Sequence, residues 1–218
     1  MTEQDRLTIL IGNIKGGAGK TTVATHLAGA FAGAWLRTAI ADCDRQRSSL
    51  RWLERRPPTV APIQGLDWSR KTGEVPDTVE RLVIDAPAAM RAGDAKDLVT
   101  LADIIIVPIL PSVMDQDATA LYLDKIGEIK SVRKNRRIVV LIGNRIRLGT
   151  NSATELDRFA AGRGLELSAR LRDTQLYATA AQRGLTVFEL GGSRAAEYQA
   201  EWAGLLRLAG CPAATPAP

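Results

Sequence analysis

A glycine-rich turn between an apolar run and an alanine-rich segment constrains this chain most. The apolar run is Leu7–Ile11, and the turn consists of Lys15, Gly16, Gly17, Ala18, Gly19, Lys20, Thr21 and Thr22. Glycines let the backbone approach a ligand closely, and successive N–H groups at the start of a helix attract an anion. The turn therefore predicts a strand, a phosphate-binding loop and a helix, in that order.

Short runs rich in Val and Ile recur further along, at Thr38–Ala41, Leu82–Ile84, Ile104–Ile109 and Ile138–Ile142. Apolar runs without alternation are typical of parallel strands that helices cover on both faces. We expect helices at Lys20–Ala34, Ser48–Arg55, Ala95–Leu101, Asp115–Val132, Ser152–Gly162, Leu176–Arg183 and Arg194–Leu208. The pattern predicts an α/β fold, a single-domain, doubly wound, mainly parallel sheet flanked by helices.

Length and composition set the outer limits of this fold. The 218 residues suffice for one domain, which we place at residues 1–211, followed by a disordered Ala/Pro tail at 212–218. Cys43 and Cys211 form no C-x-x-C pair, so we expect no disulfide framework, structural zinc or cluster. No apolar run has the length of a signal peptide or a membrane span, which predicts a cytoplasmic protein.

The loop residues predict binding of ATP with Mg²⁺. Lys20 would pair with the β- and γ-phosphates, the Thr21 hydroxyl would ligate Mg²⁺, and Thr22 would contact the α-phosphate region. The usual G-x-x-x-x-G-K-[ST] loop has a glycine where this chain has Ile14, and Lys15 is an additional lysine. An ordinary glycine turn is the alternative, but three glycines and Lys-Thr after a buried strand rarely coincide by chance.

This form of the loop resembles the signature K-G-G-x-G-K-[ST] of the ParA/MinD superfamily of deviant Walker A ATPases. Ala41–Gln46 is similar to the family's D-x-D-P-Q segment, Val83–Pro87 to its Walker B segment, and Val107–Asp115 to its V-P-x-x-P-S-x-x-D segment. In length the chain is most similar to the small ParF-like partition ATPases. Arg45 and Ala86 stand where the family has proline and threonine, which leaves the switch geometry and the hydrolysis rate open.

The resemblance implies roles for four charged residues. Lys15 would reach across an ATP-sandwich dimer and stabilise charge on the partner's nucleotide, as an arginine finger does. Asp44 would position or polarise the attacking water. Asp42 would support the Mg²⁺ shell, and Asp85 would hold Mg²⁺ through a coordinated water. Aspartates also commonly end strands and begin turns, which is the alternative for Asp42 and Asp44.

Two further polar residues could contact the adenine base or serve a local structural role. Asn144 and Arg145 follow a predicted strand, and an amide with a donor and an acceptor suits the adenine edge, so we predict that they contact the base. A turn or capping role for Asn144 is nearly as compatible. We expect His26, on the predicted first helix, to be a packed side chain rather than a catalytic base.

Basic residues are unevenly placed in a chain of net charge +5. No acidic residue occurs among seven basic ones, Lys130, Arg133, Lys134, Arg136, Arg137, Arg145 and Arg147. Charge alone fits a solvated helix end as well as a polyanion site, and the family resemblance favours DNA bound through its phosphates. The candidate DNA-binding residues are Arg133, Lys134, Arg136, Arg137, Arg170 and Arg172.

The resemblance as a whole implies a nucleoid-associated ParA-type ATPase. It would form a homodimer with ATP, bind non-specific DNA, and position a plasmid, a chromosome or a protein assembly such as a carboxysome. A ParB-like or adaptor protein would stimulate its slow, Mg²⁺-dependent hydrolysis. A MinD-like membrane-associated regulator and a metabolic P-loop ligase are the alternatives. We do not expect a membrane partner, since the last predicted helix carries only Arg207 as a basic residue near its apolar face.

Overall fold

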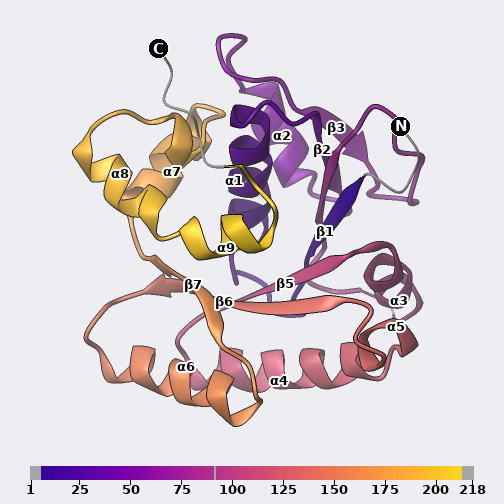
Figure 1. Cartoon of the computed structure of the whole chain (residues 1–218), viewed down its shortest axis with the longest axis vertical. Coiled ribbons are helices and arrows are strands. Elements are labelled where there is room, and N and C mark those ends of the chain that lie inside the picture. Colours follow the sequence, from indigo (N-terminus) through magenta and orange to yellow (C-terminus); the bar gives the residue numbers. More distant parts are fainter. Residues whose placement is uncertain (1–5, 91, 213–218) are drawn as a thin grey trace.

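A single sheet of seven strands runs through the computed structural model, which describes residues 6–90 and 92–212 (Figure 1). Every neighbouring pair is parallel, in the order β3-β2-β4-β1-β5-β6-β7. The strands are β1 Leu7–Ile11, β2 Thr38–Asp42, β3 Gln64–Asp67, β4 Arg81–Asp85, β5 Ile104–Ile109, β6 Ile138–Ile146 and β7 Leu167–Arg172.

Helices cover both faces of the sheet (Figure 1). They are α1 Lys20–Gly33, α2 Ser48–Glu54, α3 Ala92–Leu101, α4 Val113–Gly127, α5 Lys130–Arg133, α6 Asn151–Gly162, α7 Gln175–Gln182, the 3-10 helix η2 Val187–Glu189, α8 Ser193–Ala200 and α9 Ala203–Leu208. One core packs α1, η2 and α9 against the sheet through Phe31 and Trp202, and the other packs α3, α4 and α6 through Leu98, Tyr122 and Leu156. The predicted α/β fold is confirmed.

The five apolar runs all form strands, and two further strands have no such run. In β3 three of the four residues are exposed, so its sequence carries no buried pattern. In β7 burial alternates, with Leu167, Ala169 and Leu171 inside, because this edge strand is only partly covered. Unbroken hydrophobicity therefore finds only the central strands.

Two predicted helices are interrupted. The segment predicted as one helix from Asp115 to Val132 breaks after Gly127, where Ile129 is extended at φ −67° and ψ 127° and α5 begins. The segment from Arg194 to Leu208 divides into α8 and α9 around Trp202, whose fully buried indole anchors the junction to the core. Packing of the buried Trp202 therefore sets the second break.

The carboxyl ends of the central strands form one edge of the sheet. β1 lies between β4 and β5, and the strand register pairs Asp85 with both Ile11 and Asp42. In open α/β sheets this edge is where ligands bind. The fold thus brings the phosphate loop that follows β1 beside the aspartates that end β2 and β4.

The C-terminal residues can be compared with two predictions, the disordered tail and the alternative of a membrane-bound regulator. Apart from Pro212, the predicted tail lies outside the described residues. None of the described helices has both the length and the apolarity needed to cross a bilayer. Trp202 and Leu205 are fully buried, as expected for a core helix rather than a lipid-facing one.

Candidate active site

Residues 12–19 connect β1 to α1 as a loop with two glycines in the left-handed region. Gly17 has φ 81° and Gly19 has φ 90°, conformations that a side chain rarely adopts. A Cβ at Gly19 would also lie 2.0 Å from the Asn144 amide nitrogen. Gly16 and Gly17 are exposed, so the outer part of the loop is open to a ligand. This backbone has the form that a phosphate cradle requires.

Lys20, the first residue of α1, is buried and lies inside the loop. Its ammonium donates a hydrogen bond of 3.0 Å to the Lys15 carbonyl oxygen. Burial lowers the pKa of Lys20, while the Asp85 and Asp44 carboxylates oppose the shift. These two carboxylates are therefore near enough to act on the same ammonium, which places the three predicted site residues in one cluster.

Asp85 ends β4 with a buried carboxylate; the Thr21 hydroxyl lies near it, but no described donor makes a well-formed hydrogen bond to either oxygen. Burial raises the pKa of Asp85 to about 7, and the Asp42 carboxylate adds to the rise, whereas Thr21 and Lys20 oppose it. A buried carboxylate without partners is costly unless a cation or ordered water satisfies it. Asp85 therefore fits its predicted role, which is to hold Mg²⁺ through a coordinated water.

Protein side chains alone would not complete the Mg²⁺ site that Asp85 implies. Within residues 6–90 and 92–212, no group of three or more His, Cys, Asp or Glu side chains could hold a metal ion. Mg²⁺ commonly takes one or two protein oxygens and completes its octahedron with water and substrate phosphates. The Thr21 hydroxyl and Asp85 are donors of this kind, so the residues present fit an ion that arrives with the nucleotide.

Asp42 uses its carboxylate to hold the start of α2. One oxygen accepts hydrogen bonds from Ser49 N at 2.9 Å, Ser49 Oγ at 2.7 Å and Leu50 N at 3.2 Å, and the other accepts from Asp44 N at 3.0 Å. In this geometry Asp42 organises the loop that carries Asp44. Its place in the Mg²⁺ shell stays a prediction. Asp44 is half-buried, and its Oδ1 accepts from Gln46 N at 2.9 Å.

Asn144 fastens the phosphate loop to the end of β6. Its amide nitrogen donates to the Ala18 carbonyl at 2.8 Å, and its amide oxygen accepts from Arg145 N at 3.0 Å. These two bonds make Asn144 a clamp on the loop. An amide nitrogen carries two N–H donors, so the contact of Asn144 with the base stays a prediction. Arg145 is exposed at φ 51° on the rim, and its contact with the base stays a prediction.

His26 packs behind the loop, as expected of a structural side chain. Its Nδ1 donates to the Thr22 carbonyl at 2.8 Å, and its ring stacks on Trp202 with centroids 5.3 Å apart. Burial lowers the pKa of His26 to about 4, so the ring is neutral at physiological pH. Sequence reasoning did not foresee this aromatic contact, because the partner lies 176 positions later in the chain.

Three of the basic candidates have an ion pair within the described residues and three do not. Arg133, Lys134 and Arg136 are exposed beside α5, at the amino end of β6. The other three pair within the chain: Arg137 with Asp103, Arg170 with Asp157, and Arg172 with Glu197 and Glu201. A contact with DNA stays a prediction for all six, and Arg133, Lys134 and Arg136 are the three whose charge no acidic side chain among the described residues pairs with.

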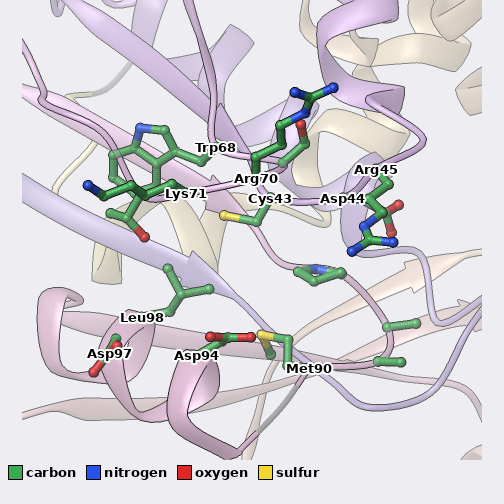
Figure 2. A pocket seen from close by; sticks show the side chains of 15 residues that line it. Cys43, Asp44, Arg45, Trp68, Arg70, Lys71, Met90, Asp94, Asp97 and Leu98 are labelled. Atoms are coloured by element: carbon green, nitrogen blue, oxygen red, sulfur yellow. The ribbon is translucent and has the colours of Figure 1, made fainter.

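A cleft of about 660 Å³ opens next to Asp44 (Figure 2). Residues 43–45, 68–72 and 87–90 line it together with the side of α3. No pattern in the sequence indicates this cleft, because β3, which ends just before Trp68, is too exposed to show a strand pattern.

Comparisons with known proteins agree with the fold and the loop. A family model of the CobQ/CobB/MinD/ParA nucleotide binding domain matches residues 9–187. The maintenance of carboxysome distribution protein A of Gloeobacter kilaueensis is 28% identical over 202 residues, which cover 87% of this chain and 88% of that protein. Among solved structures, apo McdA of Cyanothece has a TM-score of 0.71 at 15% identity, covering 92% of this chain and 99% of that one. MinD of Aquifex aeolicus has a TM-score of 0.69 at 18% identity, with 94% and 97% covered.

The two solved structures share the fold at low identity, and the family model carries the assignment. It spans well over half of the chain and includes the phosphate loop, Asp44, Asp85 and Asn144. The protein therefore belongs to the CobQ/CobB/MinD/ParA nucleotide-binding domain family and is an ATPase of the ParA/MinD type.

Proposed function

We propose that this ATPase forms a dimer around two ATP molecules, binds DNA without sequence preference in that state, and positions a cargo as a partner protein stimulates hydrolysis. The nucleoid is the DNA that we infer it uses.

Lys15 is the observation that carries the proposal. Only its backbone is engaged, through the N–H that donates to Asn13 Oδ1 at 3.2 Å and the carbonyl that accepts from Lys20. Within the described residues its ammonium has neither a hydrogen-bond nor an ion-pair partner. Beside it Gly16 and Gly17 are exposed. A lysine so placed can offer its charge to the nucleotide of a second molecule.

The other charged groups of the site have separate roles in the proposed hydrolysis. Lys20 neutralises the β- and γ-phosphates from inside the loop, and Asp44 orients the attacking water. Mg²⁺, when bound through Thr21 and Asp85, supplies further positive charge to the phosphate oxygens. Lys15 of the second molecule adds charge where it develops in the transition state.

The placement of the basic residues supports a DNA-binding dimer. Arg133, Lys134 and Arg136 lie at the amino end of β6, whereas the phosphate loop lies at the carboxyl edge of the sheet. A dimer closed across the carboxyl edge leaves the opposite edge accessible. Phosphate contacts from exposed Lys and Arg need no base sequence.

The cargo is proposed from the relative's name alone. A protein of Gloeobacter kilaueensis that is 28% identical is named for the maintenance of carboxysome distribution. A protein assembly is therefore the cargo that we propose first, and a plasmid or a chromosome region are the others.

Retention on DNA-coated beads tests the proposal. We expect wild type to be retained with ATP and released with ADP. Combined Arg133→Ala, Lys134→Ala and Arg136→Ala should lower retention about tenfold or more at 100–200 mM salt, since three phosphate contacts are lost. Arg158→Ala, at an exposed position of α6, is the matched control and should leave retention unchanged. Equal weak binding in all four cases would rule out the DNA function.

A further inference from the structure

The cleft beside Asp44 adjoins the phosphate loop, since its lining residue Ala88 lies 4.0 Å from a Cβ placed at Gly16. It touches both segments that flank the proposed hydrolytic site. Asp44 and Arg45 line it from the loop after β2, and residues 87–90 line it from the loop after β4. No residue of the phosphate loop takes part in the lining. A molecule in the cleft would therefore contact the loop of Asp44 and the segment following Asp85.

The cleft has two walls of opposite charge. Figure 2 shows Arg70 and Lys71 on one side, close to Trp68, and Asp94 and Asp97 on the other, where they project from α3. All four charged side chains belong to exposed residues. Within the described residues none of them reaches an opposite charge at salt-bridge distance. The walls thus present opposite charges to the cleft, and Arg70 also lies near enough to Asp67 to lower the pKa of that carboxyl.

The space between the walls is apolar. Cys43 and Leu98 lie between the two charged sides in Figure 2, with Trp68 on the basic side and Met90 next to Asp94. Burial raises the pKa of Cys43 to about 12, so its thiol is neutral and adds apolar surface rather than a nucleophile. The volume of about 660 Å³ is within the range of roughly 300–1,000 Å³ that is usual for ligand pockets.

This charge pattern selects among occupants. Nucleic acids and anionic lipids are uniformly negative, so they would match the wall of Arg70 and Lys71, with Arg45 nearby, but not the wall of Asp94 and Asp97. An amphipathic protein segment can match both walls, with an acidic residue toward Arg70 and Lys71 and a basic residue on the opposite side. A large apolar side chain between them would fill the centre, in the manner of an interface anchor.

We propose that this cleft is the docking site for a mixed-charge segment of a partner protein, and that the bound segment regulates hydrolysis by holding the Asp44 loop and residues 87–90 together. The proposal rests on the proposed function, because it gives a place to the partner that stimulates the ATPase. It names a surface and a partner chemistry that the phosphate site alone does not define.

Selection from a phage-displayed library of random 12-residue peptides on the full chain with ATP and Mg²⁺ tests the proposal. We expect selected peptides to share one large apolar residue between an acidic and a basic residue. As synthetic peptides they should slow amide hydrogen exchange at residues 69–72 and 95–98, and they should raise the ATPase rate several-fold.

Charge reversal of each wall separates docking in the cleft from binding elsewhere. Arg70→Glu with Lys71→Glu should weaken peptide binding at least tenfold, and a peptide whose acidic residue is changed to lysine should regain it. Asp94→Lys with Asp97→Lys tests the other wall independently and decides the matter if the first variant does not fold. Arg158→Glu with Arg183→Glu reverses two exposed charges outside the cleft and should change nothing.

Three results would overturn the inference. They are selected peptides without the shared pattern, equal binding to the wall variants and wild type, and cleft-bound peptides that leave hydrolysis unchanged. ATP-dependent retention on DNA, measured on the same wall variants, is the readout that belongs to the proposed function. If wild type fails that assay, the proposed function fails. If retention stands and the peptide results fail, only the docking site is wrong.

Discussion

At the scale of single residues, Trp35 occupies a left-handed backbone position that favours glycine. It follows the C-terminus of α1 at φ 64°, and 91% of its surface is exposed. Trp35 N donates to Ala32 O and Leu36 N to Phe31 O, a helix-ending pattern whose left-handed position is usually glycine. The indole neither packs nor relieves the backbone, so the residue costs stability here.

Trp35→Gly should therefore stabilise the protein. Removing a Cβ from the left-handed region gains about 1–2 kcal/mol, and the greater freedom of glycine in the unfolded chain offsets part of it. We expect a net rise of about 0.5–1 kcal/mol in the free energy of unfolding, measured by urea denaturation. Ala34→Gly, at φ −90°, is the control and should lose stability. A loss in both variants would contradict this account.

His26 predicts a pH dependence of stability. Its folded pKa of about 4 lies below the unfolded value of 6.5, so the unfolded chain binds the proton more readily. This contribution is complete above pH 6.5 and is lost as the pH falls toward 4. Between pH 7.5 and 5, wild type should lose about 2 kcal/mol more than His26→Gln does.

Thermal and urea unfolding of both proteins at these two pH values measure the difference. Asp85 acts in the opposite direction, since its raised pKa adds stability as the pH falls below about 7. It is present in both proteins, so its effect cancels in the comparison. The account fails if both proteins respond identically to acidification.

At the scale of elements, a buried ion pair joins the end of α2 to η2. The side chains of Arg56 and Glu189 are 6% and 12% exposed. Arg56 also donates to the carbonyls of Ala61 and Gly184, and Glu189 accepts from Thr186 N at the start of η2. The helix that Asp42 caps is thus anchored at its other end to the C-terminal helices.

Arg56→Ala should cost about 3–5 kcal/mol of stability, because it leaves the Glu189 carboxylate buried without its cation. Arg170→Ala removes the same kind of side chain from an exposed pair with Asp157, in which the two are 46% and 44% exposed, and should cost below about 1 kcal/mol. Urea unfolding of both variants checks the contrast. Similar losses of stability in both variants would show that the buried pair contributes no more than the exposed one.

At the scale of the whole molecule, a trans-acting Lys15 predicts complementation between inactive variants. Lys15→Ala and Asp44→Ala should each retain ATP binding and lose about 10³-fold or more of hydrolysis. Mixed in equal amounts before ATP is added, they should recover up to about a quarter of wild-type activity. The reason is that half of the dimers then hold one site with Asp44 from one subunit and Lys15 from the other.

Initial rates of phosphate release in the mixture check this prediction. Lys20→Ala mixed with Asp44→Ala is the control, since Lys20 acts within its own subunit and no complete site forms. A mixture of the Lys15 and Asp44 variants with no recovered activity would mean that Lys15 acts within its own subunit or that no dimer forms.

The sequence alone determined the phosphate loop, the five central strands and the family. Each of these depends on a local pattern: glycines that permit left-handed backbone, a lysine and threonines at the start of a helix, and apolar runs buried on both faces. Such patterns consist of residues that are close together in the sequence. They remain visible without any knowledge of what packs against them.

Only the tertiary structure decided what Asn144, Asp42 and His26 touch, where the helices after Gly127 and Ala200 break, and that a charged cleft adjoins Asp44. Asn144 meets Ala18 across 126 positions, and His26 meets Trp202 across the core. The cleft depends on β3, a strand too exposed to carry a pattern. The reason is physical: a polar side chain or an edge strand takes its role from the partners that folding brings to it, and those partners are distant in the sequence.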